Sequence, residues 1–255
     1  MILTDTHTHL YAGEFDTDRE ILIDAALARG VSRFFMPNID SSSIEAMLKL
    51  EVKYPEHCFP MMGLHPCSVK ENWEAELALV EQWMGKRTFV AIGEIGIDLY
   101  WDKSFIEEQR KVFLKQVDMA NHFSIPIVIH SRDSFEQIYD LLQDLPKQEP
   151  CGIFHCFTGT EDQALRAIDL GFYLGIGGVV TFKNSGLDKV VEKINPKHLV
   201  LETDAPYLAP VPNRGKRNIP EYLEQIAKKV AEIKNISVEE LAEITTKNSI
   251  NIFGK

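Results

Sequence analysis

Short apolar segments alternate with amphipathic ones along almost the whole chain. Eight runs rich in β-branched or aromatic residues have the length of buried strands, at 2–6, 33–37, 59–64, 89–93, 125–129, 152–154, 172–176 and 199–203. Segments with the apolar spacing of helices separate them, at 18–29, 42–54, 73–84, 104–123, 134–142, 160–170 and 186–193. Two further helical patterns, 221–233 and 237–253, follow the last strand. The pattern therefore predicts an alternating β/α fold.

Eight strands alternating with helices over 255 residues are typical of a TIM barrel, the (β/α)8 fold. The alternative is a doubly wound open sheet, which usually carries a glycine-rich phosphate loop after its first strand. Here the first apolar run leads into a His-x-His motif instead of glycines. Because no linker or internal sequence repeat divides the chain, we expect a single barrel domain over residues 1–255.

Composition narrows the class of protein. The hydrophobic fraction of 45% and the charged fraction of 25% are ordinary for a globular protein. No apolar stretch is long enough to span a bilayer and no signal peptide opens the sequence, so we expect a cytoplasmic location and reduced cysteines. The net charge of −11 argues against a broad basic surface that coats nucleic acid. It leaves open an enzyme that meets phosphate only in a local, metal-rich pocket.

Histidines and acidic residues follow the predicted strands. In a barrel, the carboxyl ends of the strands surround the active site, so residues distant in sequence converge there. Any one such residue could simply be the first solvated residue of a loop. Together, however, they form a set that would be costly to bury without cations. The positions are His7, His9, His65, Glu94, His130, His155, Glu202 and Asp204.

Six of these residues are candidate metal ligands, which is more than one tetrahedral ion needs and favours two divalent ions. We expect His7, His9, Glu94 and Asp204 at the first ion, and His130 and His155 with Glu94 at the second. Glu94 would bridge the ions. A water shared between them would have a pKa lowered toward ~7 and act as the nucleophile, with Asp204 orienting or deprotonating it. Oxygen and nitrogen ligands leave Mg, Mn and Zn open.

Six segments of the chain resemble the signature blocks of the TatD family, in order and with suitable spacing. The family consists of metal-dependent hydrolases on TIM barrels, and some members have deoxyribonuclease activity. The resemblance implies the same six metal ligands. The segments are Asp5-Thr-His-Thr-His-Leu10, Gly63-Leu-His-Pro66, Ala91-Ile-Gly-Glu-Ile-Gly-Ile-Asp98, Pro126-Ile-Val-Ile-His-Ser-Arg-Asp133, His155-Cys-Phe-Thr-Gly159 and Leu201-Glu-Thr-Asp-Ala-Pro206.

Three residues near the ligands have predicted supporting roles. Asp5 and Glu202 would lie one layer below the ligands and orient the histidines. His65 lies too far round the ring to need a place on either ion. It is either a structural histidine or a third catalytic group beside Asp204 and Glu94, donating to a phosphate or to developing charge.

Residues of the loops are candidates for substrate binding. Lys103, Arg132 and Arg217 could form a basic rim suited to phosphate, or could be ordinary solvated charges. Tyr207, together with Tyr100 and Trp101, could stack on bases or only pack the loops. Cys151 and Cys156 do not predict a zinc–thiolate site, because Cys156 would face away from His155 in an alternating strand.

These residues together predict a hydrolase in which two divalent ions activate water to cleave a phosphodiester bond. We expect a deoxyribonuclease acting as an exonuclease on single strands or chain ends, without a required protein partner. The alternative is hydrolysis of a C–N or C–O bond in a small molecule, as in amidohydrolase-type barrels. Those commonly bridge their metals with a carbamylated lysine, whereas no lysine ends a predicted strand here. A metal-storing or scaffold protein would instead close the coordination with protein ligands.

Overall fold

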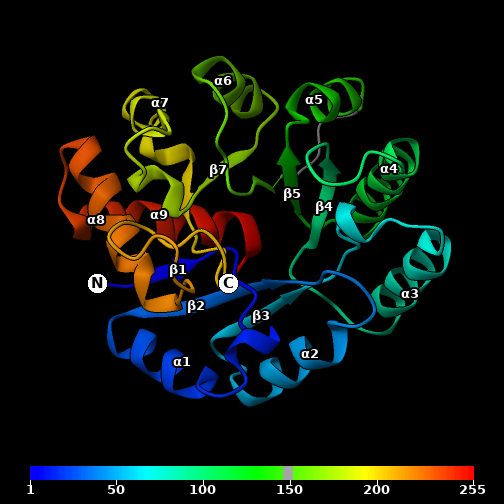
Figure 1. Ribbon diagram of the computed structural model, residues 1–255, viewed down its shortest axis with the longest axis horizontal. Coiled ribbons are helices and arrows are strands. Elements are labelled where there is room, and N and C mark those ends of the chain that lie inside the picture. The colour runs from blue at the N-terminus through cyan, green and yellow to red at the C-terminus, as the bar shows by residue number, and fades with distance from the viewer. Residues whose placement is uncertain (146–151) are drawn as a thin grey trace.

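Among the residues that the structure describes, eight parallel strands follow one another in the order of the sequence, and Figure 1 shows how they are arranged. The computed structural model describes residues 1–145 and 152–255. Strands β1 to β3 pair in one ladder and strands β4 to β8 in a second. The strands are β1 (Leu3–Asp5), β2 (Val31–Pro37), β3 (Cys58–Met61), β4 (Ile92–Asp98), β5 (Ile127–Arg132), β6 (Gly152–Phe154), β7 (Tyr173–Ile176) and β8 (Leu199–Leu201).

Two short seams join the ladders into a closed barrel. A parallel bridge between Met62 and Ile92 connects the end of β3 to the start of β4. On the other side, the Thr6 N–H donates to the Leu201 carbonyl at 3.0 Å and so connects β1 to β8. The predicted TIM barrel is therefore confirmed, and the open-sheet alternative is wrong.

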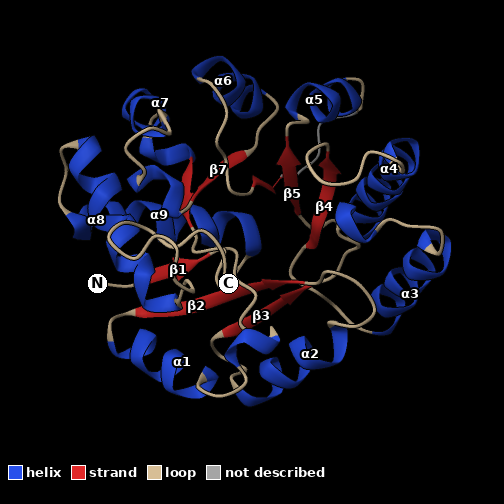
Figure 2. Cartoon of the chain, viewed as in Figure 1, coloured by secondary structure: helices blue, strands red, loops and turns tan. Residues whose placement is uncertain are grey.

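Helices surround the strands on the outside (Figure 2). Each helical segment predicted from the apolar spacing is present. They are α1 (Arg19–Ala28), α2 (Ile44–Lys53), α3 (Trp73–Lys86), α4 (Ile106–Phe123), α5 (Phe135–Gln143), α6 (Glu161–Asp169), α7 (Leu187–Lys193), α8 (Leu223–Lys234) and α9 (Val238–Phe253). Within the described ranges, none of the helices combines the length and apolar character needed to cross a membrane.

The strand boundaries differ from the predicted ones where the site begins. Strands β4 and β5 continue beyond their apolar runs, so that Glu94 and His130 lie within strands and not after them. Strand β1 ends at Asp5, so His7 and His9 belong to the following loop. A prediction from apolar runs ends a strand at its last apolar residue. It therefore misses the polar residues with which a strand continues into the site.

Helix α9 closes the end of the barrel interior at which the strands begin. This helix is anchored at the amino ends of the strands, where Asn248 Nδ2 donates to the Leu199 carbonyl at 2.7 Å and Thr246 Oγ1 to the Ile2 carbonyl at 3.0 Å. The Phe253 ring stacks on Phe35 of β2, with centroids 4.0 Å apart. Polar side chains line the opposite end of the barrel, where the strands end.

Replacing Phe253 with alanine should destabilise the barrel by about 3 kcal/mol, because the substitution leaves a cavity against Phe35. Urea unfolding followed by circular dichroism would measure the loss. Ile250→Ala, on the same helix but 41% exposed, is the control and should cost much less. Equal losses in the two variants would contradict the role given to Phe253.

Candidate metal centre

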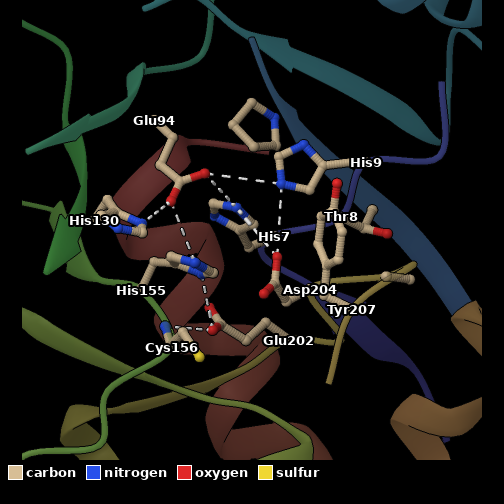
Figure 3. A network of polar contacts seen from close by, with 12 residues as sticks. His7, Thr8, His9, Glu94, His130, His155, Cys156, Glu202, Asp204 and Tyr207 are labelled. Carbon is tan, nitrogen blue, oxygen red and sulfur yellow. Dashed lines mark hydrogen bonds and ion pairs between the residues drawn. The ribbon is translucent and has the colours of Figure 1, made fainter. Parts of the chain in front are cut away.

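The carboxylate of Glu94 lies at the centre of the polar cluster and faces two groups of histidines (Figure 3). Its Oε2 is 3.1 Å from His7 Nε2 and 3.8 Å from His9 Nε2. Its Oε1 is 2.7 Å from His130 Nδ1 and 3.4 Å from His155 Nε2. Each oxygen thus faces the set of histidines that the sequence assigned to a different ion.

Asp204 completes the side of the cluster formed by β1 and β8. Its Oδ1 is 3.6 Å from His9 Nε2 and 3.9 Å from His7 Nε2. The Asp204 backbone adopts the left-handed conformation, with φ of 56°, and its N–H donates to the His7 carbonyl at 2.9 Å. The closing seam of the barrel therefore brings Asp204 beside the His-x-His motif. All six predicted ligands lie in one cluster.

His65 lies closer to the centre than predicted. We expected it too far round the ring to approach either ion, but its Nε2 is 3.4 Å from Glu94 Oε1. Glu94 reaches across from inside β4, which follows directly after the His65 loop in the barrel. His65 Nδ1 accepts a hydrogen bond from the Cys67 N–H at 3.0 Å, so only Nε2 faces the cluster. His65, Glu94 and His130 form one group of closely spaced ligand atoms.

The donor set fits divalent metal ions. Ligand atoms of His7, His9 and Glu94 lie within 4.8 Å of one another, as do those of His7, His155 and Asp204. Among the described residues, neither ring nitrogen of the fully buried His7 has a hydrogen-bond partner, although Nε2 is close to Glu94. Burying ring nitrogens without hydrogen bonds destabilises the folded state unless another group, such as a cation held between them and the carboxylates, satisfies them.

Burial and mutual charge shift the pKa values of the cluster strongly. Burial raises the pKa of Glu94, but His65, His155 and His7 outweigh it and hold this pKa well below its usual range. Burial and the nearby His155 lower the pKa of His7, whose ring stacks on that of His155 with centroids 3.4 Å apart. Glu94 is therefore a carboxylate and His7 a neutral imidazole. These are the protonation states that bind metal.

Glu202 contacts a predicted ligand from below. Its Oε1 is 3.0 Å from His155 Nδ1 and accepts a hydrogen bond from the Cys156 N–H at 2.5 Å. This contact fixes which nitrogen of His155 faces Glu94. Burial lowers the pKa of His155, but Glu202 and Glu94 together raise it to about 10 in the metal-free protein. Glu202 therefore contacts the ring of His155, and the orienting role stays a prediction.

Asp5 supports the backbone and not the imidazoles. Its Oδ1 accepts from the Thr203 N–H at 2.9 Å and the His7 N–H at 3.3 Å, while its Oδ2 accepts from Thr203 Oγ1 at 2.6 Å. Since β1 ends at Asp5, strand alternation does not carry on to His7, and the predicted contact with histidine rings does not form. Asp5 instead joins the two chain segments that hold His7 and Asp204.

Two positioning residues were missed by sequence reasoning. Asp98 Oδ2 is 2.8 Å from His130 Nε2, so His130 is held between Asp98 and Glu94. The spacing of Glu94 and Asp98 by four residues in one strand places them on the same face and could have revealed the second carboxylate. Tyr11 Oη lies 2.8 Å from His9 Nδ1 and donates to the Pro37 carbonyl, an arrangement that only the fold produces.

Cys156 does not face away from His155 as predicted. Its backbone has a φ of 45°, which interrupts strand alternation, and its sulfur groups with ligand atoms of His155 and Glu202. Burial and the nearby carboxylates raise the pKa of the thiol well above its ordinary value. A thiolate is thus disfavoured, and a zinc–thiolate site is still not expected. Cys151 lies outside the described residues.

The predicted substrate-binding residues are placed differently from one another. Tyr207 is 48% exposed at the mouth, with its ring centroid 5.9 Å from that of His9. Lys103 is exposed in the loop between β4 and α4, and Arg132 is exposed at the end of β5. Arg217 does not join a free basic rim, because its guanidinium pairs with Asp18 at 2.5 Å and donates to the Glu14 carbonyl. Its partners are about 200 positions away in sequence, so local charge patterns could not reveal the pair.

A cavity of about 430 Å³ opens beside His155, between the loops that follow β5 and β6. Its lining is mainly polar, with Ser131, Ser134 and Gln163 among the side chains, while Phe135 and Phe157 add apolar surface. Its volume lies within the range of small-molecule sites. A ligand in this cavity would contact His155, one of the candidate metal ligands, directly.

Comparison with known proteins gives full-length matches. A family model described as TatD related DNase matches residues 4–254. The chain is 39% identical over 253 residues to the uncharacterized metal-dependent hydrolase YabD of Bacillus subtilis, covering 99% of each protein. It is 32% identical over 258 residues to the 3'-5' ssDNA/RNA exonuclease TatD of Escherichia fergusonii, covering 98% of each. The crystal structure of YjjV, a TatD homolog from Escherichia coli, superposes with a TM-score of 0.94 at 28% identity, covering 99% of this chain and 98% of that chain.

Replacing Asp5 with asparagine should remove a pH dependence from the stability of the metal-free protein. Burial outweighs the hydrogen bonds from Thr203 and raises the pKa of Asp5 to about 8 from 3.8. The folded state therefore binds an extra proton between these values, and this contribution to stability is lost as pH rises through about 8. Urea unfolding in EDTA at pH 5 and pH 9 should show the variant gaining stability relative to wild type at the higher pH. The exposed Asp169→Asn is the control, and a difference that does not change with pH would contradict the assignment.

Proposed function

The chain belongs to the family of TatD-related DNases, and we propose that it is a divalent-metal-dependent deoxyribonuclease that hydrolyses phosphodiester bonds at the ends of single-stranded DNA. The observation that carries the proposal is the placement of Glu94. One buried carboxylate presents each of its oxygens to a different set of histidines. This is the arrangement that a carboxylate bridging two ions requires.

Two ions would be held on the two sides of Glu94. His7, His9 and Asp204 would bind the first together with Glu94 Oε2, and His130 and His155 would bind the second together with Oε1. His65 is close enough to the second position to approach it as well. When bound, divalent ions supply a Lewis acid for the phosphate and lower the pKa of a water molecule. The nitrogen and oxygen donors suit Mg, Mn and Zn.

Asp204 is the residue placed to handle the proton of the attacking water. Its side chain is 12% exposed, whereas those of His7, His9, Glu94 and His155 are more deeply buried, so water can reach it. Although burial raises its pKa, His9 and His155 lower it below the ordinary value. Asp204 is therefore ionised at neutral pH and can orient a water molecule or accept its proton.

In the proposed mechanism, His65 would donate to the substrate. Burial lowers its pKa, but the charge of Glu94 outweighs burial and raises it above the ordinary value. Because Nδ1 accepts from the Cys67 N–H, the ring carries its proton on Nε2. This Nε2–H faces the cluster and can stabilise charge that develops on phosphate oxygens. A residue that only supported the fold would not need its free nitrogen directed into the site.

The substrate class rests on the relatives and on the mouth of the barrel. The Escherichia fergusonii relative is named a 3'-5' ssDNA/RNA exonuclease. The cavity beside His155 is large enough for a nucleoside and joins the cluster directly. Because a chain end can enter such a cavity where an internal nucleotide cannot, we infer an exonuclease.

Glu94→Gln should abolish hydrolysis and weaken metal binding while the barrel stays folded. The amide keeps the shape of the side chain but removes the negative charge that two cations need. Calorimetric titration with Mn²⁺ and cleavage of a labelled oligonucleotide would measure the two losses, and circular dichroism would check the fold. Glu74→Gln, on the exposed face of α3, is the matched control. Retained turnover in the Glu94 variant would sink the two-metal proposal.

Hydrolysis of single-stranded DNA should disappear in EDTA and return when Mg²⁺, Mn²⁺ or Zn²⁺ is added. The assay should include small esters and amides beside the oligonucleotide, since barrels with similar centres cleave such bonds. If the protein cleaves the small esters or amides and leaves the DNA intact, the result would favour the amidohydrolase-type activity over the nuclease. Metal binding without turnover of any substrate would favour a storage or scaffold role.

A further inference from the structure

Two large aromatic residues are exposed side by side at the mouth of the barrel. Tyr100 and Trp101, in the loop between β4 and α4, are 53% and 68% exposed. Their rings meet edge to face, with centroids 4.9 Å apart and an interplanar angle of 89°. Two adjacent exposed aromatic rings offer a surface on which a planar ligand could pack.

A cation covers these rings. Arg132, at the end of β5, places its guanidinium carbon 3.9 Å from the Tyr100 centroid and 5.3 Å from the Trp101 centroid. Throughout residues 1–145 and 152–255, this guanidinium has no ion pair with a carboxylate. The Leu99 N–H donates to the Arg132 carbonyl at 2.9 Å and fixes the start of the aromatic loop to the end of β5. The charge of Arg132 therefore stays available to a ligand.

Asp98 connects this surface to the metal centre. Its Oδ1 accepts from the backbone N–H groups of Tyr100 and Trp101 at 2.9 and 3.0 Å. Its Oδ2 is 2.8 Å from His130 Nε2, and His130 in turn contacts Glu94. Burial raises the pKa of Asp98, but the hydrogen bonds from His130 and Trp101 lower it below its usual range. One buried carboxylate thus fixes both the aromatic loop and a metal-ligating histidine.

We propose that Tyr100, Trp101 and Arg132 form a stacking platform that holds an unpaired nucleobase next to the phosphodiester bond being cleaved. The proposal rests on the nuclease function proposed above and names the feature of the substrate that the site recognises. An aromatic face binds any base, and an arginine beside it can contact a neighbouring phosphate. Bases in a duplex are paired and already stacked, so the platform selects single strands.

The charge of the protein makes such a platform necessary. With a net charge of −11, the chain as a whole repels a polyanion, so long-range attraction cannot supply the affinity. Stacking does not depend on net charge and contributes at each base that it engages. Arg132 and the nearby Lys103 add positive charge only where the strand would pass.

The test compares two substrates of the same length in the presence of Mn²⁺. One is single-stranded oligothymidylate, and the other is the same phosphodiester chain built from abasic tetrahydrofuran residues. Wild type should show a KM about tenfold lower for the substrate that carries bases. Trp101→Ala should raise KM for oligothymidylate to the abasic value and leave kcat unchanged, while Trp101→Phe should retain most of the preference.

Phe123→Ala is the matched control, because Phe123 is also an exposed aromatic but lies at the far end of α4. It should leave both KM values as in wild type. Cleavage of both substrates with equal KM by wild type, or an unchanged KM in Trp101→Ala, overturns the platform and leaves the nuclease function intact. Cleavage of neither substrate overturns the nuclease function, and the platform with it.

Discussion

The site depends on one carboxylate that is removed from water and surrounded by imidazoles. Glu94 is only 2% exposed, and a buried carboxylate without compensating charge is strongly destabilising. Its position is stable because several histidines, from loops and strands on different sides of the barrel, direct nitrogens at its two oxygens. They are His7, His9, His65, His130 and His155. Any change in the barrel that displaces one histidine therefore changes the electrostatics of all the others.

Closure of the barrel is the second condition for the site. Asp5 and Thr203 are separated by 198 positions, and yet they hydrogen bond through both backbone and side chain. The same seam orders the His7 carbonyl against the Asp204 N–H. An open sheet with the same strands would leave Asp204 far from the His-x-His motif. The candidate site of the first ion thus depends on the closed topology, since Asp204 meets His7 and His9 only where the first and last strands meet.

Most of the fold and the convergence of the candidate ligands could be predicted from the sequence because both depend on local patterns. Apolar runs mark strands, and polar residues that follow them mark the carboxyl face of a barrel. Distances around the ring could not be predicted in this way. His65 was expected to lie away from the ions because its strand is third in order, but Glu94 extends toward it. The ion pair of Arg217 could not be predicted either, because its partner Asp18 lies near the other end of the chain.

Asp98 connects the candidate metal centre to the loop that carries Tyr100 and Trp101. The predicted strand ended at residue 93, so it left Asp98 outside, whereas strand β4 continues to Asp98. At Gly96, with φ of 151°, an added Cβ would lie 1.9 Å from the His130 carbonyl oxygen. Only glycine lets β4 approach β5 so closely, and this approach brings Asp98 against His130. The metal centre can thus be retained while substrate preference changes through the side chains of the loop that Asp98 holds. In the proposed nuclease, whose overall charge would repel nucleic acid, that loop would carry the recognition. Its attachment to His130 through Asp98 would keep a bound base aligned with the bond to be cleaved.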